Sequence, residues 1–230
     1  MNSLRRIAIV IYGPPGSGKG TQADLLADMF GLVHFDTGRF MEAVFRDPKR
    51  QKEKTIQREK KLFDQGILMT PIFILREVSK GVQQIAKAGR GIVFSGSPRT
   101  MYEAEGLVPI LEKLYRKSNV FFIRLDVDPK HSLERNSKRL LCSFCHSALL
   151  TKYYPSKNPK HCPVCGGSFY KRSLDNKKVI PRRLEEYKNR TEPIFGYVKK
   201  RGHHIFSVDG RPEPYKVFQH IERYISRKLT

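Results

Sequence analysis

The sequence predicts an α/β protein in which a parallel sheet is flanked by helices. Short β-branched or aromatic runs alternate along the chain with longer segments of helical periodicity, as a parallel sheet with crossover helices requires. A glycine-rich stretch separates the first of these runs from the first helical segment. In addition, 39% of the 230 residues are hydrophobic, which is enough for a buried core in one or two domains.

Five runs are expected to form the strands, because each is short and rich in residues that favour extended backbone. They are residues 7–12, 32–35, 91–95, 120–126 and 204–208. The segments between them repeat apolar residues three and four positions apart, which is typical of helices that cover a sheet. The expected helices are residues 21–30, 72–87, 102–116, 130–140, 182–200 and 213–228. The first should stop at Gly31, since glycine commonly follows the last helical residue.

Two segments lie outside this alternation. Residues 37–69 are polar and mostly helical in pattern, and residues 138–175 carry all four cysteines. We therefore expect a core formed by residues 1–36, 70–137 and 176–230, to which a helical insert (37–69) and a cysteine-bearing lobe (138–175) are attached.

The charge is strongly positive. Forty-four lysines and arginines face 22 acidic residues, a formal net charge of +22, so the partner or substrate is expected to be polyanionic: a nucleotide, a nucleic acid or an acidic surface. Charge alone does not choose among these classes.

No segment resembles a membrane span or an export signal. The apolar run at the N-terminus covers only residues 7–12, which is short for a signal-peptide core, and no other run approaches the ~18 apolar residues of a membrane helix. A cytoplasmic location is expected. In that compartment, two pairs of cysteines indicate a metal site more than disulfides.

The glycine-rich stretch GPPGSGKGT, residues 13–21, has the context of a phosphate-binding loop because it follows a strand and opens a helix. Glycines let the main chain fold around an anion, the helix N-terminus adds partial positive charge, and Lys19 can reach the outer phosphates. The general pattern places Ser or Thr directly after the lysine, whereas here Gly20 intervenes before Thr21. The residues expected to bind the nucleotide are Gly13, Gly16, Ser17, Gly18, Lys19, Gly20 and Thr21.

The cysteines form two CxxC pairs, Cys142 with Cys145 and Cys162 with Cys165, separated by sixteen residues. This spacing is typical of a four-thiolate structural zinc site, although it does not by itself distinguish zinc from iron. The first pair continues into His146 as CxxCH, a haem attachment pattern. That alternative requires export and leaves the second pair without a role.

Several motifs in order resemble those of the adenylate kinases and their nucleoside monophosphate kinase relatives. They are GKGT at 18–21, TGRF at 37–40, GILMT at 66–70, SGSPRT at 95–100, LERNSKR at 133–139, YKR at 170–172, PRRLEEY at 181–187 and VDG at 208–210. The resemblance covers nearly the whole chain. It implies a P-loop NTPase-type fold with a monophosphate-binding insert (37–69) and a zinc-ribbon lid (138–175), and a requirement for ATP with Mg²⁺ and structural Zn²⁺.

The resemblance also implies roles for individual residues. The transferred phosphoryl group would be surrounded by Lys19, Arg99, Arg135, Arg139, Arg172 and Arg183. Arg135, Arg139 and Arg211 would contact the ATP, with Arg135 and the loop after Gly210 around its base. The acceptor monophosphate would contact Thr37, Arg39, Glu42, Ile67, Leu68, Met69, Gly96, Arg99, Glu103, Arg172 and Arg183.

Three departures from the family pattern fall at the expected site. Ser95 replaces an aspartate that helps to hold hydrated magnesium; a hydroxyl can still bond a metal-bound water, but it carries no charge. Glu42 replaces an arginine that binds the acceptor phosphate. Either Arg39 or Arg46 takes over that role, or Arg39 and Glu42 form a swapped ion pair three residues apart on one helix. Glu103 replaces a glutamine that reads the acceptor adenine, and a carboxylate, which only accepts hydrogen bonds, suits guanine better. The alternative is that Glu103 is a solvated residue of the expected helix 102–116.

A further departure concerns the lid. The acidic pair that follows the lid arginine is reduced to Leu174 and Asp175, and the usual Tyr-His pair is Leu149 and Leu150. These changes are expected to weaken contacts that close the lid, while zinc binding should survive.

The sequence thus predicts a reversible nucleoside monophosphate kinase, most simply an adenylate kinase that converts ATP and AMP into two ADP, acting as a monomer. One alternative is the same fold with a changed acceptor such as GMP, or with little catalysis. Another is a basic zinc-ribbon protein that binds nucleic acid; under the kinase hypothesis nucleic acid is only a secondary, charge-driven contact.

Overall fold

The computed structural model describes residues 6–149, 151, 154, 159–171, 175 and 179–229. A parallel five-stranded sheet has the order β2-β3-β1-β4-β8, and it confirms the predicted α/β class. Its strands are β1 (Ala8–Tyr12), β2 (Val33–Phe35), β3 (Ile92–Phe94), β4 (Val120–Asp126) and β8 (Ile205–Asp209). The register is continuous across the centre, where Ile9 lies between Val93 of β3 and Phe121 of β4.

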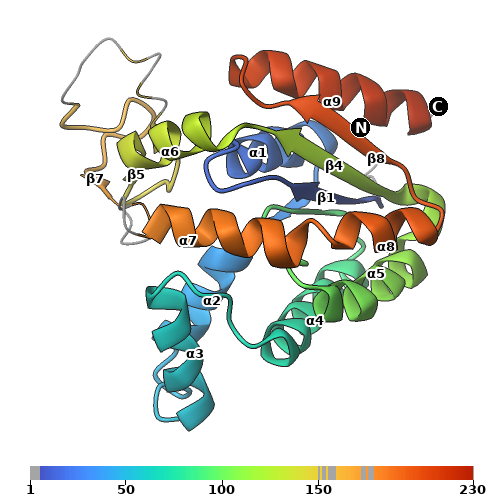
Figure 1. Ribbon diagram of the computed structural model, residues 1–230, viewed down its shortest axis with the longest axis horizontal. Helices are drawn as coiled ribbons and strands as arrows, with labels where there is room; N and C mark the ends of the chain where they lie inside the picture. Colours follow the sequence, from blue (N-terminus) through green and yellow to red (C-terminus); the bar gives the residue numbers. More distant parts are fainter. Residues whose placement is uncertain are drawn as a thin grey trace.

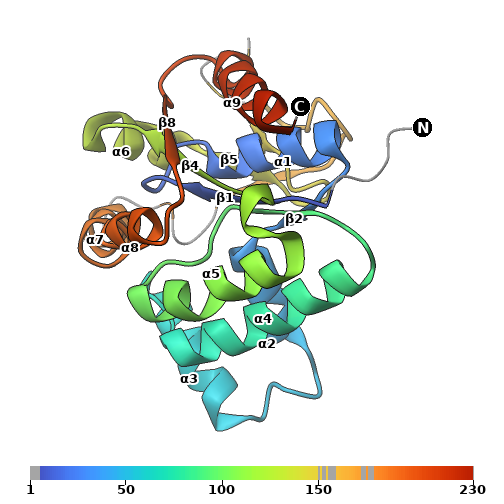
Figure 2. The same cartoon turned by 90° about the vertical axis from the view of Figure 1, so that its right-hand side faces the viewer.

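Both faces of the sheet are buried, as a parallel sheet requires. Side chains of β1 alternate between two cores: Ala8, Val10 and Tyr12 face one, and Ile9 and Ile11 face the other. The second core is covered by α1 (Lys19–Phe30) and α9 (Pro214–Leu229), and the first by α4 (Pro71–Lys87), α5 (Met101–Tyr115) and α8 (Ile194–Lys200). Figures 1 and 2 show these two helical layers on opposite sides of the strands.

Two of the helices differ from the expected ones in where they end, and the others follow the local signals in the sequence. Helix α1 stops at Gly31, whose φ of 65° is the left-handed conformation expected of a glycine after a helix. The expected helix 182–200 is instead divided into α7 (Val179–Glu186), a π-helical turn (Tyr187–Thr191) and α8. Here the N–H of Glu192 reaches back five residues to the carbonyl of Tyr187, and Pro193, which follows, has no N–H to continue the regular ladder.

The second helix that differs is the expected helix 130–140. Helix α6 covers Pro129–Lys138, and Leu140 already belongs to strand β5 (Leu140–Cys142). The helix begins after Asp128, whose carboxylate accepts a hydrogen bond from the N–H of His131 at 3.0 Å. The chain leaves the helix here because β5 pairs with β6 (Ala148–Leu149) and with β7 (Phe169–Tyr170) in a small antiparallel sheet.

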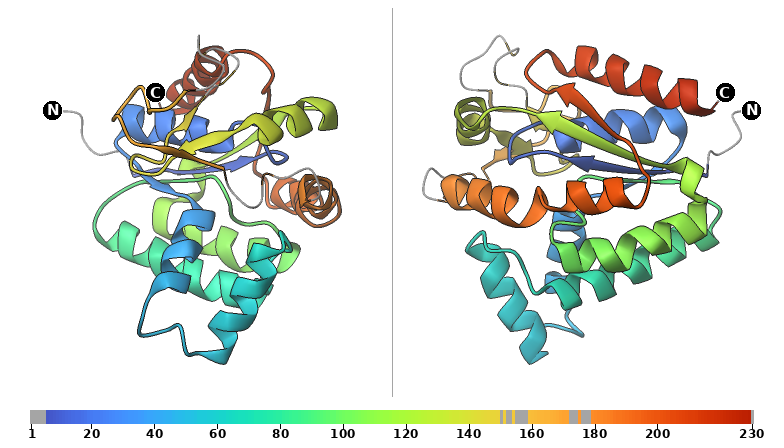
Figure 3. Two further views of the ribbon diagram at one scale, coloured as in Figure 1. Left: turned by 90° about the vertical axis from the view of Figure 1, so that its left-hand side faces the viewer. Right: turned by 45° about the vertical axis from the view of Figure 1, so that its right-hand side comes forward.

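The polar segment 37–69 is helical, as expected, and forms α2 (Thr37–Arg46) and α3 (Lys54–Asp64). The buried Glu59 ties α3 to the residue that precedes α4, since its carboxylate accepts hydrogen bonds from the N–H and the hydroxyl of Thr70 at 2.7 and 2.6 Å. Figure 3 shows this segment and the small antiparallel sheet at the same end of the large sheet. Among the described residues, no helix has the length and apolar character that crossing a membrane requires.

Candidate active site

The phosphate-type loop lies between β1 and α1, and its glycines are required by close packing. Gly13 has a φ of 151°, and a side chain there would meet the hydroxyl of Ser17. Gly16 has a φ of 77°, and an added Cβ would lie 2.8 Å from the carbonyl oxygen of Ser132 on α6. The loop therefore holds its shape against α6, with its open side toward a cavity.

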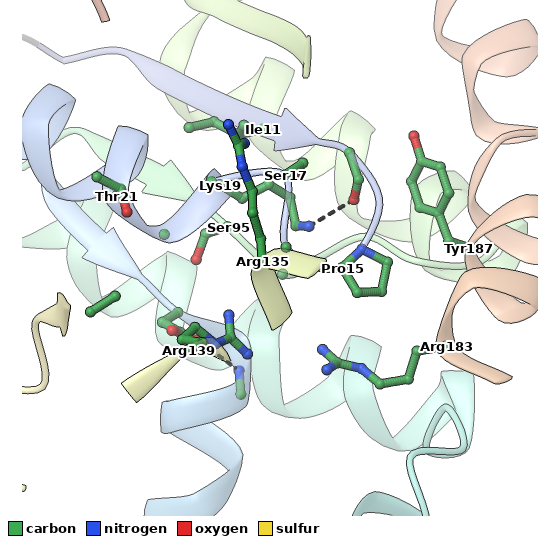
Figure 4. A pocket seen from close by; sticks show the side chains of 18 of the residues that line it. Ile11, Pro15, Ser17, Lys19, Thr21, Ser95, Arg135, Arg139, Arg183 and Tyr187 are labelled. Atoms are coloured by element: carbon green, nitrogen blue, oxygen red, sulfur yellow. Dashed lines mark hydrogen bonds between the residues drawn. The ribbon is translucent and has the colours of Figure 1, made fainter. Parts of the chain in front are cut away.

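Lys19 begins α1 and turns back over the loop. Its Nζ donates hydrogen bonds to the carbonyl oxygens of Gly13 at 2.7 Å and Pro14 at 2.9 Å, and Figure 4 shows the ammonium directed at the loop. Burial lowers the pKa of Lys19 well below its ordinary value, and the positive charges of Arg99, Arg183 and Arg139 lower it further. The phosphates of a nucleotide bound in this cavity would raise the pKa of Lys19 again, because they supply negative charge.

The cavity has a volume of about 840 Å³ and gathers residues from distant parts of the sequence. Among the described residues, every predicted site residue except Glu42 and the cysteines lines it: Gly13, Gly16, Ser17, Gly18, Lys19, Gly20, Thr21, Thr37, Arg39, Ile67, Leu68, Met69, Gly96, Arg99, Glu103, Arg135, Arg139, Arg183 and Arg211. Glu42 is half-buried on α2, and its role stays a prediction. Arg172 lies outside the described residues.

Two of the arginines share one buried carboxylate. Arg139 donates to Asp175 with Nε at 2.9 Å and Nη2 at 2.6 Å, and Nη1 of Arg183 lies 3.5 Å from the same side chain. Asp175 is fully buried. The sequence pattern marked this residue only as the remnant of an acidic pair, whereas in the structure its carboxylate contacts both guanidinium groups. Figure 4 shows Arg139 and Arg183 in the cavity.

Arg135 holds the loop that follows β8. It donates from Nη1 to the carbonyl oxygen of Gly210 at 2.6 Å and from Nη2 to that of Arg211 at 2.7 Å. Arg211 in turn pairs with Asp209 at 2.8 Å. These contacts place α6 and this loop together on the side of the phosphate loop, where the resemblance expects the donor base.

Glu103 is buried, which excludes the alternative that it is a solvated helix residue. Its carboxylate accepts hydrogen bonds from the N–H of Arg99 at 2.8 Å and from the hydroxyl of Thr100 at 3.0 Å, while the N–H of Glu103 donates to that hydroxyl at 3.3 Å. This reciprocal arrangement caps the start of α5. Burial raises the pKa of Glu103, and the two hydrogen bonds oppose that rise.

On the other wall, Arg39 and Thr37 begin α2. Arg39 pairs with Asp36 at 3.5 Å and donates to the carbonyl oxygen of His146, so the structure supplies Asp36 as its carboxylate partner. Thr37 is buried and donates from its hydroxyl to that of Ser97 at 3.0 Å. Arg46, the other proposed replacement for the family arginine, is exposed and does not belong to the described lining of the cavity.

Sequence reasoning missed the surroundings of Ser95. The Nε2 atom of His34 lies 2.8 Å from the hydroxyl oxygen of Ser95, and its Nδ1 lies 2.6 Å from Oδ1 of Asp24. Asp24 and Ser95 both line the cavity, and His34 connects them. The three residues come from α1, from β2 and from the end of β3, so no local spacing could have indicated that they meet.

The four cysteines form one cluster. Their Sγ atoms all lie within 4.8 Å of one another, with Cys142 3.4 Å from Cys165 and Cys145 3.7 Å from Cys162. A tetrahedral Zn²⁺ site with Zn–S bonds of 2.3 Å separates its sulfurs by about 3.8 Å, so the described thiolates fit that ion. His146 and His161 do not belong to this group of described ligands. The CxxCH pair is therefore half of a four-thiolate site.

The site combines a phosphate loop on a parallel sheet, a lysine and several arginines that line one cavity, and a lobe that carries four clustered thiolates. These features define a P-loop phosphotransferase. The sequence model of the adenylate kinase family matches residues 11–203. The adenylate kinase of Methanothrix thermoacetophila is 33% identical over 219 residues, which are 95% of this chain and 98% of the relative. That of Methanosarcina barkeri is 30% identical with the same coverage, and that of Elusimicrobium minutum is 33% identical over 96% of this chain and 99% of its own.

The chain belongs to the adenylate kinase family. It is a phosphotransferase that uses ATP with Mg²⁺, and its four-cysteine cluster can hold a structural Zn²⁺.

Proposed function

We propose that this enzyme transfers the terminal phosphoryl group of ATP to AMP, reversibly, to give two ADP. The observation that supports this most directly is the convergence of Lys19, Arg99, Arg139 and Arg183 on one cavity, between the phosphate loop and residues 66–69. Phosphoryl transfer needs two anionic nucleotides placed in line and positive charge around the migrating group, with little covalent chemistry from the protein. This chain supplies those charges.

On the donor side, the main-chain N–H groups of the loop and the start of α1 bind the phosphates. The ammonium of Lys19 leaves the carbonyl oxygens of Gly13 and Pro14 and moves to the β- and γ-phosphates. Arg139 and Arg183, held by Asp175, face the transferred group, and the guanidinium forks suit phosphate oxygens better than a point charge does. The loop held by Arg135 contacts the base.

On the acceptor side, Arg99 binds the monophosphate, and the base lies against the apolar residues 67–69. The carboxylate of Glu103 is held at the start of α5 by the N–H of Arg99 and the hydroxyl of Thr100. Membership of the adenylate kinase family favours AMP as the acceptor, and GMP is the alternative because a carboxylate that only accepts hydrogen bonds suits guanine.

The segment 138–175 acts as a lid and the segment 37–69 as the acceptor arm of a core made of residues 1–36, 70–137 and 176–230. Lid closure excludes water, which would otherwise accept the phosphoryl group. Zn²⁺ keeps this small lobe folded, because its own core is too small to do so. The enzyme works as a cytoplasmic monomer, and nucleic acid is only a charge-driven contact.

A panel of nucleoside monophosphates, assayed with ATP and Mg²⁺, tests the acceptor. The highest kcat/KM is expected for AMP, and Glu103→Gln is expected to preserve that order. If GMP or CMP is phosphorylated at least as well as AMP, the acceptor assignment is wrong.

Lys19→Met tests the donor site, because it keeps the length of the side chain and removes its charge. A loss of at least about 10²-fold in kcat is expected, the range associated with one strong charge contact in the transition state. Lys87→Met, at an exposed lysine in the last turn of α4 that does not belong to the described lining of the cavity, is the matched control. Full activity of Lys19→Met would contradict the kinase assignment.

A further inference from the structure

The most informative departure in the cavity is Ser95, because a histidine contacts its hydroxyl and a carboxylate contacts that histidine. Ser95 follows β3 at the end of the sheet that faces the phosphate loop, and it is 8% exposed. Its hydroxyl contacts His34, whose side chain is 10% exposed, and His34 contacts Asp24. Figure 4 shows Ser95 in the same cavity as Thr21 and Lys19.

For a neutral His34, one set of hydrogen-bond directions satisfies all three groups. An ionised carboxylate only accepts, so Nδ1 of His34 carries a hydrogen that it donates to Asp24. In the neutral imidazole, Nε2 is then the acceptor and receives the hydrogen of the Ser95 hydroxyl. The lone pairs of the Ser95 oxygen are thereby left free to accept hydrogen bonds from within the cavity.

We propose that Asp24, His34 and Ser95 form a relay that replaces an acidic side chain at position 95 and holds the hydrated Mg²⁺ of the bound ATP. This proposal rests on the proposed function only in requiring ATP with Mg²⁺ in the cavity. Ser95 contacts a metal-bound water or the metal itself, while His34 and Asp24 are positioning residues.

The relay would act by polarising the Ser95 hydroxyl and by fixing its orientation. Mg²⁺ prefers oxygen ligands and keeps several of its waters, and the hydroxyl oxygens of Thr21 and Ser95 both belong to residues that line this cavity. A serine alone rotates freely and carries no charge. A hydrogen-bonded chain that ends in a carboxylate fixes the rotation and increases the electron density on the hydroxyl oxygen. When a histidine is itself a metal ligand, a carboxylate that accepts its other ring N–H orients the ring and raises its basicity in a comparable way.

Asp24 lies where its carboxylate is open to solvent. It is exposed on α1, one turn before Asp28, which is also exposed. The carboxylate of Asp24 is therefore in contact with solvent, and His34 links it to the hydroxyl of the buried Ser95.

The test compares the binding of ATP in two states, with Mg²⁺ and with excess EDTA, by calorimetry on the whole protein. Asp24→Asn keeps the size of the side chain and removes its charge. It is expected to weaken MgATP binding about 10-fold, the lower end for loss of a group behind a metal ligand, and to leave metal-free ATP binding unchanged. Asp28→Asn removes an equal charge from the same helix and is expected to change neither.

A rescue experiment distinguishes positioning from a structural role. In the Ser95→Asp background a carboxylate is already present in the cavity, so Asp24→Asn is expected to cost less than about 2-fold in MgATP binding. An equal loss in both backgrounds, or an equal loss with and without Mg²⁺, would overturn the relay. These readouts do not depend on the acceptor nucleotide, so failure of the AMP assignment would leave them interpretable.

Nitrogen NMR of wild-type protein at pH 8 gives a measurement that needs no variant. His34 is expected to be the Nδ1–H tautomer, and its Nε2 signal is expected to shift when Mg²⁺ is added to protein saturated with a non-hydrolysable ATP analogue. An Nε2–H tautomer in the absence of metal would contradict the proposed direction of the hydrogen bonds.

Discussion

Arg39 donates a hydrogen bond from Nη2 to the main-chain carbonyl oxygen of His146 at a distance of 3.1 Å, although 107 residues separate them in the sequence. Arg39 lies in the first turn of α2, and His146 directly follows Cys145 of the thiolate cluster. The contact therefore joins the segment 37–69 to the segment 138–175, and both residues line the cavity. We expect it to couple the positions of the two proposed moving parts of the enzyme.

Arg39→Ala is expected to shift the enzyme toward open conformations. A hydrogen bond from a partly exposed cation contributes about 0.5–1 kcal/mol, which corresponds to a change of about 2- to 5-fold in the closing equilibrium. Fluorescence energy transfer between dyes on α3 and on the cysteine-bearing lobe measures this change. Arg46→Ala, at an exposed arginine of the same helix, is the control, and an equal response of both variants would contradict a specific contact.

Removal of zinc is expected to unfold the lobe and leave the sheet intact. Cys145→Ser should reduce the bound zinc to a small fraction and add an early step to the thermal unfolding curve, because three ligands hold the metal far more weakly than four thiolates. Elemental analysis and calorimetry measure the two effects. His146→Asn is the control, since asparagine tolerates the φ of 58° at this position and removes no ligand. Loss of zinc in that control would show that the imidazole takes part.

Glu103→Gln is expected to change the pH dependence of stability. Because burial raises the pKa of Glu103 in the folded protein above its ordinary value of 4.5, the folded protein binds this proton more tightly than the unfolded chain does. The contribution of Glu103 to stability is therefore most favourable below pH 4.5 and is lost as the pH rises through the folded pKa.

The uncharged variant should accordingly gain stability relative to wild type between about pH 4.5 and pH 7, by up to about 1 kcal/mol at pH 7. Urea unfolding at several pH values measures the difference. Glu105→Gln, at an exposed position two residues further along α5, should show no such trend. A constant difference across the pH range would contradict the raised pKa.

Asp175→Asn is expected to impair both folding and catalysis. The buried carboxylate neutralises Arg139 and Arg183, and its loss leaves two guanidinium groups without their shared acceptor. Breaking a buried ion pair costs about 3–5 kcal/mol, and the partial exposure of both arginines reduces the expected loss to about 2–3 kcal/mol. Urea denaturation measures this value.

Kinetics separate the positioning role of Asp175 from the stability effect. At a temperature where Asp175→Asn is fully folded, kcat should still fall by at least about 10-fold, because Arg139 and Arg183 lose their orientation. Arg124 and Asp126 form a comparable but exposed pair, so Asp126→Asn serves as the control. A variant that is destabilised but has wild-type kcat would limit Asp175 to a structural role.

The sequence by itself determined the fold class, the phosphate loop and the thiolate cluster. Each of these is encoded over a short distance: the alternation of strand and helix, the glycines around Lys19, and two pairs of cysteines that each close a tight turn. Local backbone preference and ligand spacing suffice for such features.

The tertiary structure decided the contacts between segments that are distant in sequence. It brought Asp175 to both Arg139 and Arg183, and it brought Asp24 and His34 to Ser95. These side chains lie on different elements, and their contacts depend on the strand order β2-β3-β1-β4-β8 and on how each helix packs. The sequence alone does not specify these contacts between side chains. They depend on which helix faces pack against the sheet, and hydrophobic burial determines that only once the whole sheet has formed.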